Sequence, residues 1–197
     1  MSSQTSKFCP HIERMTYIMN EDKKMARRKA RESVFELLYE TEYQPDTSPE
    51  EIYALSCENR DIDEADKYIR RTYFGAKEQQ ARLDILISRH AKGWKTNRLS
   101  RMTRTILRLG TYEMAYGNLP APVAINEAVE LSKKFDDPTR EPGRTPAYVF
   151  INGVLNAIKN DLAENGIPVL PEPVAEEPAP AEAVETAEAA TAEEIHE

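Results

Sequence analysis

Apolar residues recur every three to four positions along most of this chain, and that period is the strongest constraint on its fold. Ala30, Val34, Leu37 and Leu38, for example, form one stripe along a helix. No stretch alternates apolar and polar residues as a half-buried strand does. The sequence therefore predicts an all-α fold, with helices over 27–43, 48–57, 63–92, 99–116, 123–135 and 147–163.

Helix-start signals sharpen two of these boundaries. Ser48 is followed by Pro49 and two glutamates, a pattern in which serine caps the helix and the carboxylates meet its positive end. Asp63 is the expected cap of the long third helix, and Gly75 marks an expected bend within it.

The net charge of −8 is distributed unevenly along the chain. Residues 167–197 hold nine glutamates and no lysine, arginine or aspartate, so the rest has 26 basic against 25 acidic residues. An acidic, Pro- and Ala-rich segment of this kind buries too little apolar surface to fold. We expect a disordered extension over 1–24, a helical domain over 25–166 and a disordered acidic tail over 167–197.

Several functional classes lack their sequence signals. The two cysteines, Cys9 and Cys57, favour free thiols in a reducing compartment, and no apolar run is long enough for a membrane span or a signal peptide. The three histidines have no metal-ligand spacing, and no phosphate loop or nucleophile motif occurs. We expect a cytoplasmic protein that is not an enzyme and uses no metal or cofactor.

A basic run, Arg27, Arg28, Lys29 and Arg31, opens the first predicted helix. Cations at a helix N-terminus oppose the helix dipole, so the placement costs local stability unless an anion meets them. Arginine binds phosphate through a planar, bidentate fork. On the residues alone, a solvated surface beside Glu32 and Glu36 and an RNA-binding surface are equally good interpretations.

Two motifs near the C-terminal end place small polar residues inside apolar helical runs. Asn126 and Glu127 lie in one motif, and Asn152 and Gly153 follow Phe150 in the other. Asparagine and glycine lower helix propensity, so we interpret these four residues as joints that let the last two helices approach closely. An enzymatic reading of Glu127 as a general base lacks a nucleophile and a histidine partner.

The basic run and the two motifs together resemble the NusB family of transcription antitermination proteins, over residues 25 to about 160. The resemblance implies two small helical bundles that share a core. It also implies binding to single-stranded boxA RNA of ribosomal RNA operons, together with the ribosomal protein NusE in the RNA polymerase antitermination complex. Some family members are homodimers and others monomers, and the resemblance leaves that choice open.

Site residues follow from the same resemblance. It assigns RNA contacts to Arg27, Arg28, Lys29 and Arg31, and to two aromatic residues, Phe150 and Tyr39, whereas we leave Phe135 in the core. Aromatic side chains at such a rim stack on unpaired bases.

The chain also departs from the family. Thr103 and Asp136 replace residues that are commonly acidic and glycine, and the loop before Phe150 is longer. Two alternatives remain: a helical protein–protein adaptor without RNA binding, and a NusB-like domain of an RNA methyltransferase.

Overall fold

The structure, a computed structural model, describes residues 10–60, 62, 66–93, 98–117, 119–135 and 145–169, with side chains from Ala26 onward. Within these ranges it contains seven α-helices and no strand. The helices are α1 (Pro10–Thr41), α2 (Pro49–Asn59), α3 (Lys67–Glu78), α4 (Gln80–His90), α5 (Arg101–Ala115), α6 (Ala121–Phe135) and α7 (Ala147–Asn165). The all-α prediction is confirmed.

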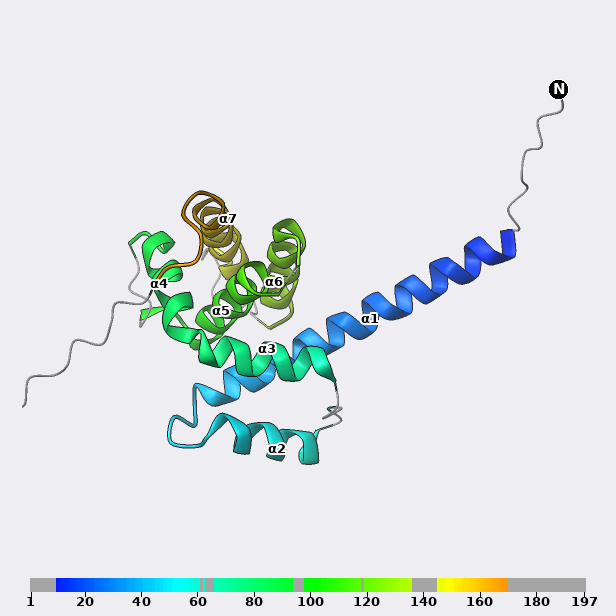
Figure 1. The fold of residues 1–197 in the computed structure, drawn as a ribbon, viewed down its shortest axis with the longest axis horizontal. Coiled ribbons are helices and arrows are strands. Elements are labelled where there is room, and N and C mark those ends of the chain that lie inside the picture. The colour runs from blue at the N-terminus through cyan, green and yellow to red at the C-terminus, as the bar shows by residue number, and fades with distance from the viewer. Residues whose placement is uncertain are drawn as a thin grey trace, which may run out of the picture.

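The helices form two bundles around one continuous core (Figure 1). In one bundle α1 packs against α2 and α3, and in the other α5, α6 and α7 pack against one another. Helix α5 belongs to both, because it also contacts α1, α3 and α4. Burial of each large apolar side chain contributes about 1.5–3 kcal/mol, and the largest fully buried ones include Leu37, Tyr73, Leu83, Leu86, Leu107, Ile151, Leu155 and Ile158.

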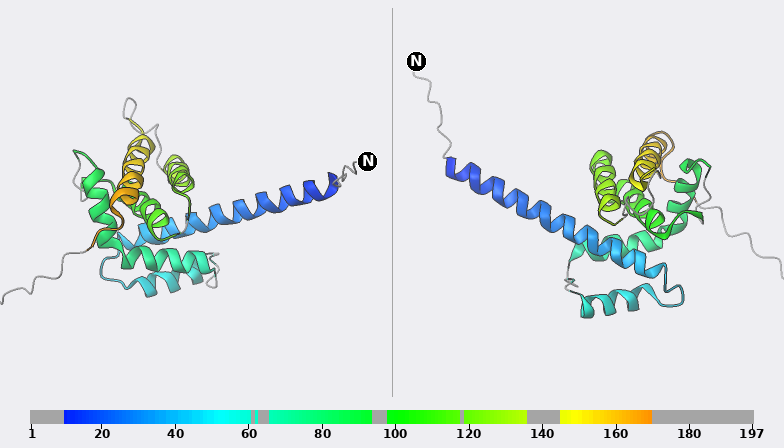
Figure 2. Two further views of the ribbon diagram at one scale, coloured as in Figure 1. Left: turned by 45° about the horizontal axis from the view of Figure 1, so that its top comes forward. Right: turned by 180° about the vertical axis from the view of Figure 1, so that it is seen from behind.

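Helix α1 is longer than predicted. It begins at Pro10 and not at Arg27, and its N-terminal part extends beyond the other helices (Figure 1, Figure 2). The predicted boundary at residue 25 therefore falls inside one continuous helix. Extending a helix from an anchored segment costs little, because each further residue adds one hydrogen bond, so polar residues can continue α1 without an apolar stripe.

The predicted long third helix is two helices. Asp66, and not Asp63, caps α3, and its carboxylate accepts hydrogen bonds from the Tyr68 and Ile69 amides. Asp63 lies outside the described residues. The break falls at Gln79 and not at Gly75. Gly75 instead allows α3 to pack closely against α5, since a Cβ atom there would lie 2.0 Å from the hydroxyl oxygen of Tyr112.

Other boundaries agree with the prediction. The Ser48 hydroxyl accepts from the Glu51 amide at the start of α2. Ser100 caps α5 in the same way through the Thr103 amide, and Thr103 itself is buried. Helix α7 ends before Gly166, whose φ of 72° lies in the left-handed region that glycine favours. The tail from residue 170 onward lies outside the described residues.

Candidate nucleic-acid interface

The four cations of the basic run point in different directions from α1. Arg27, Arg28 and Lys29 are exposed, whereas Arg31 is only 3 % exposed. Because consecutive residues of a helix are rotated by about 100°, one face of the run meets the core while the others meet solvent. The structure thus separates three surface cations from one internal cation.

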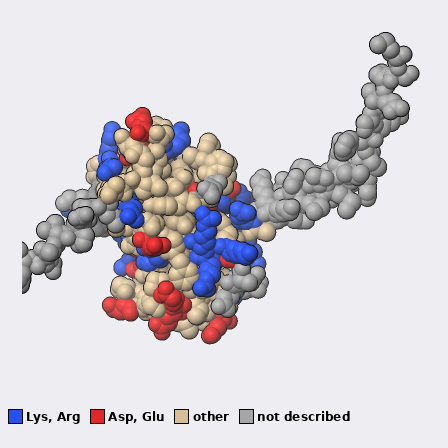
Figure 3. Space-filling view, in the orientation of Figure 1, with Lys and Arg blue, Asp and Glu red and all other residues tan. Residues whose placement is uncertain are grey.

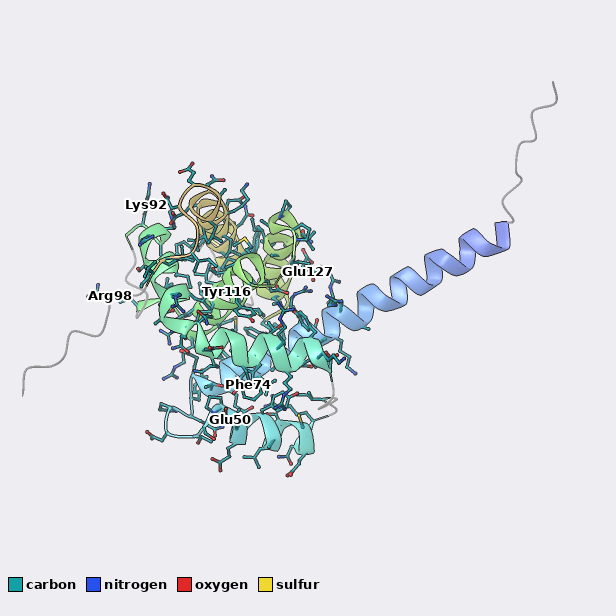
Figure 4. All side chains as sticks on the ribbon, viewed as in Figure 1. Glu50, Phe74, Lys92, Arg98, Tyr116 and Glu127 are labelled. Carbon is teal, nitrogen blue, oxygen red and sulfur yellow. The ribbon has the colours of Figure 1, made fainter. Side chains whose placement is uncertain are left out.

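Arg31 is held inside by two carboxylates from other helices. Its Nε donates to both carboxylate oxygens of Glu113 on α5, at 3.0 and 3.1 Å, and its Nη1 donates to Glu127 on α6 at 2.8 Å. The Tyr68 hydroxyl of α3 donates to Glu113 at 2.7 Å. Figure 4 shows Glu127 where α6 meets α1. This network joins four helices, so Arg31 is a structural ion-pair partner and the prediction that it contacts RNA is wrong.

Burial and pairing shift the ionisation of this network. Burial raises the pKa of Glu113 above its ordinary value, although Arg31 and the Tyr68 hydroxyl favour its ionised form. Burial and the Glu113 carboxylate likewise raise the pKa of Tyr68. Burial is the largest single influence on Arg31 and opposes its charge, but Glu113, Tyr68 and Glu127 together outweigh it, so the pKa of Arg31 is raised. The positive charge of Arg31 is therefore held by carboxylates inside the protein.

Toward α6, the basic surface consists of cations that face carboxylates; we call this the α6 side. The Lys134 amine lies 2.7 Å from Glu32, and the Arg28 Nε lies 4.0 Å from Glu127. Lys133 pairs with Glu130 at 2.8 Å. A shallow cleft of about 110 Å³ runs between α1 and α6 here. Positive and negative charges alternate along it.

Toward α3, the surface has a different charge pattern; we call this the α3 side. The guanidinium of Arg27 lies 5.3 Å above the Tyr68 ring. Arg27 lines a cleft of about 250 Å³ together with Lys67 and Arg71 of α3. The α3 cations were not singled out in the sequence, because only the fold brings α3 beside the basic run.

A row of aromatic rings follows α1 away from the basic run. Phe35 packs between Phe135 of α6 and Tyr39, with ring centroids 4.6 and 5.7 Å apart. The Tyr39 ring in turn contacts the ring of Tyr43, which is 52 % exposed. The Arg101 guanidinium lies 4.3 Å from the centroid of the Tyr43 ring. Tyr43 was not among the residues predicted to bind RNA, although its spacing of four residues from Tyr39 predicts this contact on a helix.

The two predicted RNA-contacting aromatics are both accessible in part. Tyr39 is half-buried, and its hydroxyl shares a hydrogen bond of 2.8 Å with that of Tyr43. Phe150 is half-buried at the start of α7 and packs against the core, as does Phe135. Phe135 packs against the core without being fully buried, and its assignment to the core and the RNA contacts of Tyr39 and Phe150 stay predictions.

The predicted joint residues do different work from that expected. Glu127 does connect two helices, but its carboxylate accepts from Arg31 and so links α6 to α1 and not to α7. Asn126, Asn152 and Gly153 are exposed, and a Cβ atom added to Gly153 would meet nothing within 4 Å. The prediction that Gly153 permits close helix packing is wrong, because it faces outward on α7. Tight packing instead occurs at Gly110, where a Cβ would lie 3.0 Å from Leu155.

In the described part of the chain, no three His, Cys, Asp or Glu side chains lie close enough together to hold a metal ion. Within the same residues, no helix is long and apolar enough to cross a bilayer.

The fold and the basic helix define a class: an all-helical protein with an arginine-rich surface helix over a shared two-bundle core. The sequence profile of the NusB family matches residues 28–160. The chain belongs to the NusB family, as the resemblance predicted.

Individual relatives agree over most of their length. The transcription antitermination protein NusB of Bacillus pumilus is 38 % identical over 141 residues, which cover 71 % of this chain and 99 % of the relative. The Bacillus subtilis protein of the same name is 37 % identical over 143 residues, 72 % of this chain and all of the relative.

Solved structures show the same architecture. T. maritima NusB is 35 % identical, with a TM-score of 0.58 over 68 % of this chain and 91 % of its own. A crystal structure of the antitermination factors NusB and NusE in complex with double-stranded RNA contains a chain that is 27 % identical. Its TM-score is 0.58, over 68 % of this chain and 96 % of its own.

Proposed function

We propose that this protein is a transcription antitermination factor that binds RNA together with a NusE-type ribosomal protein. One observation carries the proposal: Arg27, Arg28 and Lys29 stay exposed near the start of the folded body, while the neighbouring Arg31 anchors their helix from inside. The solved NusB–NusE–RNA complex of a relative supports it, because this chain has the same fold.

The physical roles divide between charge and stacking. Exposed arginines and lysines bind phosphates and supply an affinity that falls with salt. Half-buried aromatics such as Tyr39 and Phe150 supply stacking on unpaired bases, which A-form double helices do not offer. This division favours a single-stranded target, and we propose boxA RNA of ribosomal RNA operons.

The proposal has finer parts. The protein acts in the cytoplasm within the RNA polymerase antitermination complex, and its function is non-enzymatic. The choice between monomer and homodimer stays open, and analytical ultracentrifugation of this chain without RNA decides it. In the adaptor alternative, the basic helix meets an acidic protein partner and the protein binds no RNA.

Filter binding of boxA-like and scrambled RNA, at several salt concentrations and with and without NusE, tests the main proposal. The informative variant is Arg27→Gln with Arg28→Gln, because Arg31 substitutions would damage the fold. For a single strand, each lost phosphate contact lowers the log–log salt slope by about 0.7, so the pair lowers it by about 1.4.

The matched control is Lys92→Gln with Arg98→Gln. Both control cations are exposed, and Figure 4 shows them on the far side of the molecule from α1's basic run. Equal salt slopes for wild type and the Arg27/Arg28 variant would show that these α1 cations do not contact RNA. NusE binding without any RNA binding would establish the adaptor alternative.

A further inference from the structure

Helix α3 presents three cations in its first two turns. Lys67 is its first residue, Arg70 and Arg71 follow one turn later, and all three are exposed. The first turn of α3 contains no acidic residue, and the Asp66 carboxylate is engaged in capping the helix amides. Cations near a helix N-terminus oppose the helix dipole, so their placement at the start of α3 favours an external anion.

Aromatic rings and a backbone carbonyl hold two of these cations in position. The Arg70 guanidinium lies 5.4 Å from the Phe74 ring centroid and 5.9 Å from that of Tyr53. Arg71 donates from Nη2 to the Tyr116 carbonyl at 3.0 Å. Figure 4 shows Phe74 between α3 and α2. Neither interaction neutralises charge, so both guanidinium groups are preorganised and keep their full positive charge.

Among the residues that the structure describes, no carboxylate forms an ion pair with the α3 cations, Lys67, Arg70 and Arg71. On the α6 side, by contrast, each of the three cations faces a glutamate: Arg28, Lys133 and Lys134. Glu50 of α2 borders the same depression as Arg70 and Phe74 without reaching ion-pair distance. Three acidic residues, Asp61, Asp63 and Glu64, precede α3 in the sequence and lie outside the described residues.

The α3 cations are continuous with the basic run of α1. Arg27, Lys67 and Arg71 line one cleft, and Tyr68 forms part of its lining under the Arg27 guanidinium. Figure 3 shows lysine and arginine side chains gathered on this face, where α3 crosses α1. A polyanion bound at Arg27 can therefore continue onto α3 without leaving the protein surface.

We propose that Lys67, Arg70 and Arg71 form a second phosphate-binding surface, which receives the backbone of RNA that flanks the segment bound at α1. This inference rests on the proposed RNA-binding function and extends it to a specific face. Guanidinium and ammonium groups contact phosphates without reading bases. The surface therefore adds affinity for longer RNA of any flanking sequence.

The experiment compares two RNAs: the boxA-like element alone, and the same element with flanking uridines on both sides. The variant is Arg70→Gln with Arg71→Gln, and the control is again Lys92→Gln with Arg98→Gln. We expect the variant to lower the salt slope for the long RNA by about 1.4 and to leave that for the short RNA unchanged. Arg70→Lys, which retains the charge, should restore most of the lost contact at its position.

Each other outcome overturns the inference in a distinguishable way. Equal salt slopes for variant and wild type on the long RNA would show that α3 does not bind phosphate, and the proposed function would stand. If wild-type protein binds neither RNA, both the α3 surface and the proposed RNA-binding function are wrong.

Two further outcomes assign α3 another role. If the variant gains RNA affinity, and deletion after Val169 abolishes that gain, the surface holds the acidic tail instead. If Arg70→Gln alone lowers the melting temperature and leaves the slope unchanged, Arg70 serves the packing of α2 on α3.

Discussion

The two sides of α1 carry similar numbers of cations and differ in what faces them. On the α6 side, Arg28, Lys133 and Lys134 each lie near a glutamate. On the α3 side, Arg27 and Arg71 lie against a tyrosine ring and a backbone carbonyl. Rings and carbonyls position a cation without neutralising it, whereas a carboxylate competes with an incoming phosphate. We therefore expect pairing, more than the count of basic residues, to decide where a polyanion binds. Arg28 is the least constrained cation of the α6 side, because its Nε lies 4.0 Å from Glu127, and its side chain is 45 % exposed.

Arg31 marks the boundary between the two sides. Its guanidinium contacts Glu127, which belongs to the α6 side, and Glu113, which lines the α3-side cleft. The network holds α1 in one rotation against α3, α5 and α6. That rotation determines which of the neighbouring cations faces α6 and which faces α3.

The largest effect that we predict is for Arg31→Ala. The substitution leaves two carboxylates without their cation in a buried site, which costs about 3–5 kcal/mol of stability. Chemical denaturation measures this loss. Arg27→Ala, one helical turn earlier on the exposed surface, is the matched control and should change stability by less than about 1 kcal/mol. Similar denaturation midpoints for the two variants would show that the ion-pair network of Arg31 does not stabilise the packing of α1.

The Arg31→Ala defect should grow with pH. Burial already raises the pKa of Glu113, and loss of the guanidinium raises it further. The folded variant then binds a proton that the unfolded chain has released above the ordinary carboxyl pKa of about 4.5, so stability falls as pH rises from there toward the raised pKa. The slope is up to about 1.4 kcal/mol per pH unit. Denaturation at pH 5 and pH 8 measures it, and a defect that shrinks with pH contradicts the account.

Phe150→Ala tests whether this half-buried ring of α7 contributes stacking to RNA binding. Removal of the ring should cost about 1–3 kcal/mol of RNA affinity, measured by filter binding. The control is Phe135→Ala, whose ring packs against Phe35, and it should affect melting temperature more than RNA affinity. If Phe150→Ala lowers stability by about 3–5 kcal/mol with normal RNA affinity, the ring belongs to the core alone.

Two glycines offer a matched pair of substitutions. Gly75→Ala places a Cβ against Tyr112, under the α3 side, and should destabilise by about 1–3 kcal/mol. Gly153→Ala places a Cβ in open space within α7 and should stabilise by about 0.5–1 kcal/mol through helix propensity. Thermal unfolding of both variants decides. If Gly153→Ala is destabilised, the close helix packing predicted from the sequence at this position is correct after all.

Glu32→Gln should make the α6 side resemble the α3 side. Its carboxylate pairs with Lys134 at 2.7 Å, and without it this lysine is available to a phosphate. We expect the salt slope of RNA binding to steepen by about 0.7, with a stability change of about 1 kcal/mol or less. Lys134→Gln in the Glu32→Gln background should reverse the gain. An unchanged slope would show that pairing does not limit RNA binding on this side.

Deletion of the acidic tail should have the smallest effect. Pro168 is buried, so the deletion starts after Val169. The melting temperature should not change, while RNA affinity at low salt should rise, because a tethered polyanion no longer competes for the cations of the α3 side. The gain should fade as salt shortens the reach of those charges. Equal affinities at low ionic strength would leave the tail without a regulatory part.

The helical fold and most helix boundaries follow from local patterns in the sequence. Apolar spacing places the core residues of α5, such as Ile106 and Leu109, and local caps such as Ser48 depend on residues three positions apart. These signals act within a few turns of chain, so they survive in any tertiary context. The family motifs and the basic run are equally visible in the linear sequence.

Which charges are exposed and which small residues are tightly packed depends on how the helices pack against one another. Arg28 and Arg31 are three positions apart, yet one is exposed and the other buried, because α5 and α6 cover only one face of α1. Gly75 meets a tyrosine and Gly153 meets solvent, although both interrupt helical runs. The α3 surface requires Arg27 and Arg71, far apart in sequence, to line one cleft. Such contacts depend on how helices pack, and that information is not contained in any local pattern.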